Sequence, residues 1–275
     1  MLTFSLITVC YNAAVTIGRT LDSVKQQSWQ QVEHIIIDGG STDGTINIIN
    51  DYQTAVIARQ PTSDITPHSH TVNVISEPDK GIYDAMNKGV ARAQGDYVCF
   101  LNAGDALYDA DTLSTIASVI TCSASDSRPA VIYGDTVIID NEGNILGPRH
   151  LSAPEQLSSS AFRKGMLVCH QAFYARTDIA KATPYNLHYR YSADVDWCIR
   201  VMKEGERQHA PLVNAHTTVA RYLQEGTTTR HHRASLKERF HVMSNHYGIT
   251  STLWNHILFL FRAVKRKAIH NTHHT

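Results

Sequence analysis

The sequence lacks several features that assign a protein to a functional class at once. Among its 275 residues there is no run of about 18 consecutive apolar residues, so we expect no membrane-spanning helix. Its 25 Lys+Arg residues balance its 25 Asp+Glu residues, which leaves no overall positive field to attract nucleic acid. The first residues show no basic segment followed by an apolar segment and a cleavage site, so we expect no signal peptide.

Two motifs that bind nucleotides are also missing. No Gly-x-Gly-x-x-Gly follows the first strand-like segment, and Gly-x-x-x-x-Gly-Lys-Ser/Thr does not occur. These absences argue against a dinucleotide-binding Rossmann site and against a P-loop nucleotide hydrolase. The five cysteines form no Cys-x-x-Cys pair and most lie in apolar runs, so we expect reduced, buried thiols and a cytoplasmic location.

What is present over the first 105 residues is an alternation of apolar, strand-like segments with helical patterns. The triple Ile within 34–38 is typical of a strand that is buried on both faces. We expect a variable surface loop over 54–71. Strands are expected at 2–9, 34–38, 72–76 and 96–101, and helices at 14–27, from 46 onward and at 82–93. This alternation indicates an α/β fold with a parallel central sheet.

The regularity falls after residue 105. Residues 148–168 are mixed, and we expect them to line a substrate pocket. Ser192 is a suitable N-cap for a helix that begins at Ala193. We further expect strands at 130–135, 136–140, 169–174 and 216–222, and helices near 113–120, 233–247 and 250–268.

Polar residues follow each of the first four strands, at Thr8–Asn12, Asp38–Asp43, Glu77–Gly81 and Asn102–Asp105. In an open α/β sheet, ligands bind beyond the carboxyl ends of the strands. Carboxylates gathered there repel each other unless a cation or a donor-rich ligand joins them. A nucleotide with a divalent metal fits all four loops, whereas ordinary strand-end turns are the alternative.

These segments carry a resemblance to a known family. Residues 5–12, 20–27 and 36–45 resemble the nucleotide-binding half of family 2 glycosyltransferases. Residues 76–89 and 95–105 resemble the branch that builds bacterial surface polysaccharides, such as the colanic-acid-type transferases. The likeness continues more weakly over 165–230, at His170-Gln171 and at Ala193–Trp197.

The resemblance implies a GT-A fold, in which a Rossmann-like, mostly parallel sheet is flanked by helices. We expect the glycosyltransferase domain at 1–230, with a nucleotide-binding half at 1–105 and an acceptor half at 106–230. Residues 231–275 are expected to form C-terminal helices that associate with a membrane.

The resemblance also implies a donor site and a metal site. Asp38 is expected to contact the base or the ribose, and Asp105 to bind Mn²⁺ or Mg²⁺, because it is the one acid left of the family's Asp-x-Asp-Asp-like motif. Asn102 then stands beside the metal as a neutral neighbour. The residues expected to bind the nucleotide-sugar donor are Thr8, Val9, Tyr11, Asn12, Asp38, Asp79, Lys80, Gly81, Asn87, Asn102, Ala103 and Gly104.

Asp194 matches the acid that serves as the catalytic base in this family. In an inverting transferase, a carboxylate takes the proton of the acceptor hydroxyl as that oxygen attacks the anomeric carbon. Asp196 is the alternative base, and both residues are also acids favoured in a first helical turn by the helix dipole. His170 and Gln171 either contact the acceptor or the diphosphate, or belong to the core.

Residues 253–268 combine apolar side chains with a basic cluster at Arg262, Lys265, Arg266 and Lys267. This pattern suits a helix that lies on an anionic membrane surface, and a packed C-terminal helix is the alternative.

Taken with the family resemblance, the expected activity is an inverting, metal-dependent transfer from a UDP-sugar to a lipid-linked saccharide at the cytoplasmic face of the membrane. A non-catalytic sugar-nucleotide or glycan-binding protein is the rival interpretation. A nucleotidyltransferase would need a Gly-rich basic loop after the first strand, which Cys10-Tyr11-Asn12 does not offer.

Overall fold

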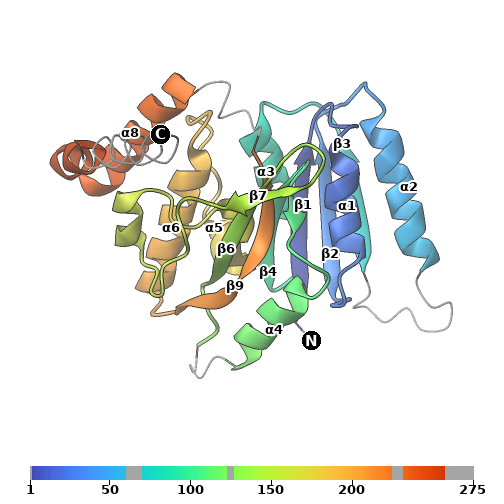
Figure 1. The fold of residues 1–275 in the computed structure, drawn as a ribbon, viewed down its shortest axis with the longest axis horizontal. Coiled ribbons are helices and arrows are strands. Elements are labelled where there is room, and N and C mark those ends of the chain that lie inside the picture. Colours follow the sequence, from blue (N-terminus) through green and yellow to red (C-terminus); the bar gives the residue numbers. More distant parts are fainter. Residues whose placement is uncertain (1, 60–69, 123–126, 225–231, 258–275) are drawn as a thin grey trace, which may run out of the picture.

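The computed structural model describes residues 2–59, 70–122, 127–224 and 232–257 (Figure 1). The first half alternates strands and helices as the sequence predicts. Its elements are β1 (Phe4–Cys10), α1 (Ile17–Lys25), β2 (Val32–Asp38), α2 (Thr45–Ala58), β3 (Thr71–Ser76), α3 (Ile82–Arg92) and β4 (Tyr97–Asn102).

The second half is less regular. It contains β5 (Ala106–Leu107), α4 (Thr112–Cys122), β6 (Val131–Ile139), β7 (Ile145–Pro148), the 3₁₀ turns η1 (Ser159–Lys164) and η2 (His170–Ala172), β8 (Phe173–Arg176), α5 (Thr177–Ala182), α6 (Ala193–Arg207), β9 (Leu212–Leu223) and α8 (His232–Tyr247). A further helix follows at 249–257, and the rest of the expected 250–268 helix lies outside the described residues.

One sheet runs through both halves, in the order β3-β2-β1-β4-β8-β6-β9-β5, with β7 on β6. The pairs β3–β2, β2–β1 and β1–β4 are parallel, as expected. Beyond β4 the sheet is mixed, because β8 is antiparallel to both β4 and β6. The sheet curls round so that β5, just after β4 in sequence, pairs with β9 at the far edge.

Helices cover both faces of the parallel part. Ile36 packs with Ile49 and Tyr52 of α2 on one face, whereas Ile35 and Ile37 belong to the core on the other face. Successive side chains of a strand point to opposite faces, so the triple Ile fills two cores at once. The expectation of a strand buried on both faces is confirmed. In Figure 1, α1 and α2 lie side by side at one end of the molecule, and α8 lies beyond α6 at the other.

Several expected boundaries are wrong. The segments 130–135 and 136–140 form the single strand β6, and the expected strand at 169–174 begins as the turn η2 and becomes extended only at Phe173. Helix α2 continues to Ala58, into the expected loop over 54–71, and residues 60–69 lie outside the described part.

All five cysteines are free thiols, as expected. Four of them are buried, and Cys122 is exposed.

Gly89 lets α3 pack closely against β1 of the sheet. A Cβ at this position would clash with the Cγ2 of Ile7, a fully buried residue of β1. We expect Gly89→Ala to lower the free energy of unfolding, because overpacking costs about 1–3 kcal/mol. Gly18→Ala in α1 is the matched control, since no atom lies within 4 Å of its added Cβ. It should raise stability by up to about 1 kcal/mol. Urea unfolding measures both, and equal effects would contradict this packing.

Candidate active site

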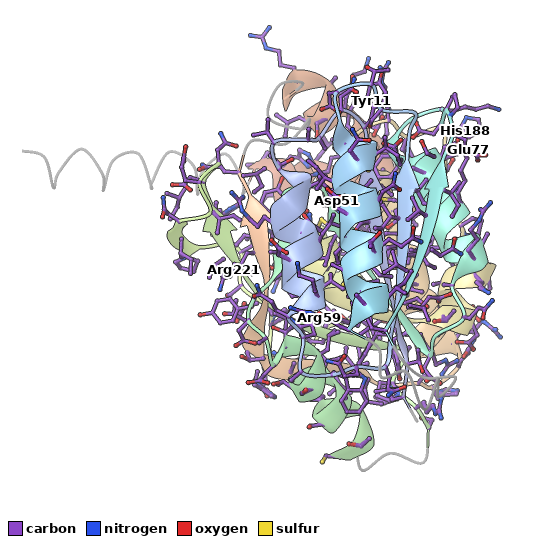
Figure 2. The ribbon with its side chains drawn as sticks, turned by 90° about the vertical axis from the view of Figure 1, so that its right-hand side faces the viewer. Tyr11, Asp51, Arg59, Glu77, His188 and Arg221 are labelled. Atoms are coloured by element: carbon purple, nitrogen blue, oxygen red, sulfur yellow. The ribbon has the colours of Figure 1, made fainter. Side chains whose placement is uncertain are left out.

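The carboxyl ends of the four parallel strands meet in register. Cys10 pairs with Asp38, Asp38 with Ser76, and Val9 with Asn102. The loops that follow these residues therefore begin at one edge of the sheet. Figure 2 shows Tyr11, in the first of these loops, near one end of α2 and Arg59 near the other end.

Asp38 organises two of these loops. Its buried carboxylate accepts hydrogen bonds from the backbone N–H of Gly40 (3.2 Å) and Ser41 (3.0 Å), and from the hydroxyls of Ser41 and Ser76. Burial raises the pKa of Asp38, but the hydrogen bonds from Ser41 and Ser76 outweigh it and bring the pKa below its ordinary value. The carboxylate is thus ionised and fixes the turn after β2 to the end of β3.

Gly39 lets three loops approach each other. A Cβ there would lie 2.6 Å from the Oδ2 of Asp79 and 3.3 Å from the ring of Tyr11, so a larger residue would not fit without a shift. Asn12, with φ of 48°, accepts a hydrogen bond from the N–H of Thr42 at 2.9 Å. Among the expected donor residues, Tyr11, Asn12, Lys80 and Gly81 are exposed around this meeting point and Asp79 is partly exposed.

Three of the expected donor residues face elsewhere. The hydroxyl of Thr8 lies 2.9 Å from the Nε2 of buried His34, and Val9 is part of the core. Asn87 uses both ends of its amide on the backbone of Tyr185, donating to its carbonyl (3.0 Å) and accepting from its N–H (2.7 Å). Asn87 therefore holds the segment before α6 against α3.

Asp105 joins the loop after β4 to two segments of the second half. Its buried carboxylate accepts hydrogen bonds from the Nε2 of Gln171 (2.7 Å) and the N–H of Leu223 (3.0 Å). Burial raises the pKa of Asp105 to about 6, although these hydrogen bonds oppose the shift. Gly104 packs closely against Leu223, since a Cβ added at Gly104 would lie 2.6 Å from the Cδ2 of Leu223. Asn102, three residues earlier, keeps a buried Oδ1 that has no hydrogen-bond partner among the described residues.

Asp194 lies in the first turn of α6, between donors from two other elements. Its Oδ1 accepts a hydrogen bond from the hydroxyl of Tyr83 (3.2 Å), and its Oδ2 lies 3.5 Å from the Nδ1 of His170. The other nitrogen of His170 lies 3.4 Å from the amide of Asn102. Burial raises the pKa of Asp194, but His170 and Arg239 lower it to below its ordinary value. Asp194 is therefore ionised near neutral pH.

Asp196 has different neighbours. Its carboxylate pairs with the Nε2 of His246 and the Nε of Arg200, each at 2.7 Å. It is buried at 4% exposure beneath α8. The two acids, only two residues apart, thus point to different surroundings, and Asp196 is tied to the packing of α8 on α6.

Tyr83 is the neighbour of Asp194 that sequence reasoning missed. It is the second residue of α3, two positions after Gly81 of Asp79-Lys80-Gly81, and this closeness in the sequence is the signal that could have revealed it. Its ring stacks on Tyr185 at 5.5 Å, and Tyr185 stacks on Trp197 of α6 at 5.0 Å. This stack links α3 to the helix that carries Asp194.

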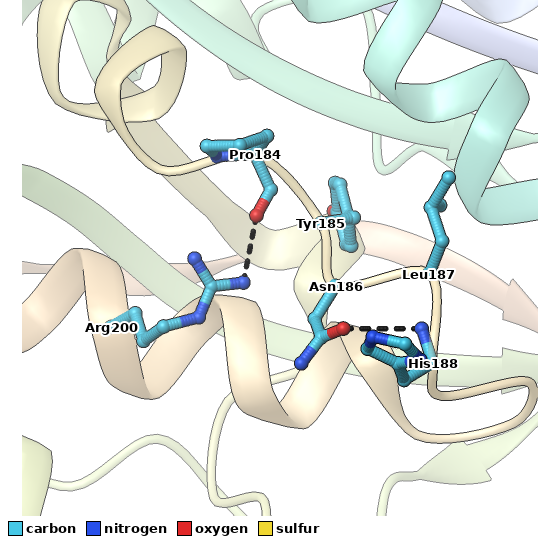
Figure 3. A pocket seen from close by; sticks show the side chains of 6 residues that line it. All are labelled: Pro184, Tyr185, Asn186, Leu187, His188 and Arg200. Atoms are coloured by element: carbon cyan, nitrogen blue, oxygen red, sulfur yellow. Dashed lines mark hydrogen bonds between the residues drawn. The ribbon is translucent and has the colours of Figure 1, made fainter.

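A pocket of about 610 Å³ lies against Tyr185, the middle ring of this stack (Figure 3). Its lining consists of Pro184, Tyr185, Asn186, Leu187, His188 and Arg200, none of which is an expected site residue.

Within the described residues, no group of three or more His, Cys, Asp or Glu side chains could hold a metal ion. In the same part of the chain, no helix is both long and apolar enough to cross a membrane.

Comparison with known proteins decides the family. The profile of Glycosyl transferase family 2 matches residues 5–183, more than half of the chain. The chain belongs to glycosyl transferase family 2. The PGL/p-HBAD biosynthesis glycosyltransferase of Mycobacterium bovis is 35% identical over 199 residues, which cover 72% of this chain and 68% of the relative. The amylovoran biosynthesis glycosyltransferase AmsB of Erwinia amylovora is 24% identical, with 78% and 70% covered.

Solved structures resemble this family 2 glycosyltransferase in fold. S. aureus TarS 1-349 in complex with UDP-GlcNAc matches with a TM-score of 0.61 and 16% identity, over 82% of this chain and 59% of that one. The mannosyltransferase PcManGT from Pyrobaculum calidifontis, in complex with GDP-Man and Mn²⁺, matches with a TM-score of 0.53 and 13% identity, over 92% and 73%. The expected GT-A fold and transferase activity are confirmed, whereas the likeness to the colanic-acid branch is minor.

The buried charge of Asp105 predicts a pH dependence of stability. Its pKa is about 6 in the folded chain against an ordinary 3.8, so the folded state holds the proton more tightly. This contribution to stability is present below pH 4 and is lost as the pH rises through 6, by about 3 kcal/mol. Asp105→Asn removes this dependence, so the unfolding free energy of the variant relative to wild type should rise between pH 4 and 7 in metal-free buffer.

Asp196→Asn is the control with the opposite sign. Burial raises the pKa of Asp196, but His246 and Arg200 outweigh it and lower the pKa. Its contribution is therefore present above the unfolded pKa and is lost as the pH falls. Denaturant titrations at several pH values measure the free energy of unfolding of both variants and of the wild type. If the difference between Asp105→Asn and the wild type does not change with pH, the assigned burial of Asp105 is contradicted.

Proposed function

We propose that this glycosyltransferase moves a sugar from a UDP-sugar to a saccharide with inversion, and that Asp194 is the catalytic base. The observation that carries the proposal is the setting of Asp194: an ionised, mostly buried carboxylate, held by Tyr83 and His170 close to the loop after β4. The structures of S. aureus TarS with UDP and with UDP-GlcNAc support the choice of donor.

In the proposed reaction, the donor binds along the loops after β1, β2 and β3. Tyr11 and Asn12 provide exposed contacts to the nucleoside, and Asp79 to Gly81 lie beside it. The acceptor hydroxyl approaches Asp194, which takes its proton as the oxygen attacks the anomeric carbon. The bond to the diphosphate breaks on the opposite side of that carbon, so the configuration inverts. His170, between Asp194 and Asn102, keeps the base at a fixed distance from the loop after β4.

A divalent metal fits the residues after β4. Asp105 supplies one carboxylate, and each carboxylate oxygen can accept more than the single hydrogen bond it has here. Asn102 supplies a buried Oδ1 that no other group in the described part of the chain contacts by a hydrogen bond. Magnesium-type sites use one or two carboxylates and take further ligands from phosphates and water. Asp105 and Asn102 would hold such an ion, and the chemistry it would supply is neutralisation of charge on the leaving diphosphate. The structure of PcManGT in complex with GDP-Man and Mn²⁺ supports this proposal.

The base assignment predicts different outcomes for two matched substitutions. Asp194→Asn keeps size and shape but cannot take a proton, so kcat for UDP release from UDP-sugars with Mn²⁺ should fall by about 10²–10⁴-fold. Donor affinity should stay near that of wild type, because the donor loops lie on other elements. Asp196→Asn should cost less than about tenfold in kcat and lower Tm instead, since it breaks a buried ion pair.

Steady-state kinetics and isothermal titration with the same UDP-sugars decide between the outcomes. Near-normal kcat in Asp194→Asn, together with a collapse in Asp196→Asn, would identify the other carboxylate as the base. Donor binding by wild type with no UDP release under any condition would instead favour the non-catalytic binding protein.

We also propose that residues 1–230 are the transferase domain and that residues 231–275 face the cytoplasmic side of an anionic membrane. The acceptor at that membrane is then a lipid-linked saccharide. Helix 249–257 supports this, because Ile249, Leu253, Trp254 and Ile257 expose 62%, 49%, 64% and 45% of their surface. The spacing of Ile249, Leu253 and Ile257 places them on one face of the helix. The basic cluster at 262–267 follows in the sequence.

The membrane proposal predicts a loss of vesicle binding on substitution of this face. Leu253→Gln with Trp254→Gln should weaken co-sedimentation with phosphatidylglycerol vesicles by tenfold or more, on the order of two buried apolar side chains. Ile145→Gln, at a similarly exposed position on β7, should have no effect. Wild-type chain that does not sediment with anionic vesicles, or sediments equally with phosphatidylcholine vesicles, would contradict the proposal.

A further inference from the structure

Helix α8 contacts the segment that carries Asp194 on both of its sides. Before Asp194, the carboxylate of Glu238 accepts hydrogen bonds from the backbone N–H of Arg190 (2.8 Å), Tyr191 (2.6 Å) and Ser192 (2.6 Å). After Asp194, the Nε2 of His246 lies 2.7 Å from the Oδ1 of Asp196. Two side chains of one helix therefore fix the turn that presents the proposed base.

The Glu238 contact fixes the backbone just before α6, a helix whose N-cap side chain makes no capping hydrogen bond. The first N–H groups of a helix lack partners within it, and a side chain at the N-cap position often accepts one. Ser192 is at that position, as expected, but its hydroxyl donates to the carbonyl of Ser235 at 3.3 Å and makes no cap hydrogen bond. Glu238 instead receives the N–H groups that lead into α6. Its charge strengthens these bonds and suits the positive end of the α6 dipole.

Helix α8 is well anchored for this role. Val242 and Met243, between Glu238 and His246, are buried at 0% and 1% exposure. Asn245 donates a hydrogen bond to the hydroxyl of Tyr189, at the start of the same segment, at 3.0 Å. The 190–192 backbone is thus attached to a helix that is itself held in place by buried side chains.

We propose that Glu238 is a positioning residue, which holds the backbone of 190–192 so that Asp194 meets Tyr83 and His170. The inference rests on Asp194 as the base. The two contacts of Asp194, at 3.2 Å and 3.5 Å, leave little room for displacement before the carboxylate loses both partners. A misplacement of about 1 Å can reduce turnover by about 100-fold.

The first test follows the backbone itself. Glu238→Gln keeps the size of the side chain but removes the charge and turns an N–H₂ group toward one of the three donors. Amide hydrogen exchange over 189–197 should increase by tenfold or more. The matched control is Glu206→Gln, because Glu206 likewise accepts the N–H (2.6 Å) and hydroxyl (2.7 Å) of Ser159 at the start of η1. It should increase exchange around 158–165 and leave 189–197 unchanged.

The second test separates positioning from a purely structural effect. In the full chain, Glu238→Gln should lower kcat for UDP release from UDP-GlcNAc by about tenfold to 100-fold, with KM changed less than threefold. In an Asp194→Asn background the same substitution should have no further effect, because no base remains to be positioned. Glu206→Gln should leave kcat within about twofold in both backgrounds.

The outcomes distinguish the positioning role of Glu238 from the assignment of Asp194 as the base. Unchanged exchange over 189–197 in Glu238→Gln, or the same loss of kcat with and without Asp194, would overturn the role of Glu238 while the base assignment stands. Wild-type kcat in Asp194→Asn alone would overturn the base assignment, and the positioning role with it.

Discussion

The parallel pairing of β3, β2, β1 and β4 in common register is the constraint on which the candidate site depends. Because Asp38 pairs with both Cys10 and Ser76, and Asn102 with Val9, the four polar loops start at one edge of the sheet. The sheet then curls through β8, β6 and β9, which brings Leu223 at the end of β9 to the carboxylate of Asp105. The fold thus closes the second half of the chain onto the loops of the first.

Charge and burial divide the carboxylates of this region into different tasks. Asp38 and Asp196 are satisfied by several fixed partners and hold segments together. Asp105 is buried with two uncharged donors, Gln171 and Leu223, so burial raises the pKa of its carboxyl, and a nearby cation would favour its ionised form. Asp194 stays ionised between Tyr83 and His170, with its partners drawn from α3 and η2. Each task follows from the neighbours, which differ although the residue type is the same.

The sequence predicts the first half of the fold closely, because its strands and helices follow each other locally and each has a clear apolar period. The second half was predicted less well. Nothing local distinguishes one long strand over 131–139 from two short ones, and the pairing of β6 with β8 and β9 decides it. The motif residues Asp105 and Asp194 could be named from the resemblance. The roles of Asn87 and Glu238 could not, since Tyr185 and residues 190–192 lie far from them in the sequence.

The central claim is that a nucleotide sugar binds across the loops at the end of the parallel strands. Amide hydrogen exchange of the full chain, with and without UDP-GlcNAc and Mn²⁺, tests this most directly. We expect UDP-GlcNAc and Mn²⁺ to slow amide exchange at 10–12, 39–44, 79–81 and 102–105. The part of this protection that depends on Mn²⁺ should be lost in Asp105→Asn. Protection confined to 184–188, around the pocket of Figure 3, or none in the four loops, would contradict it.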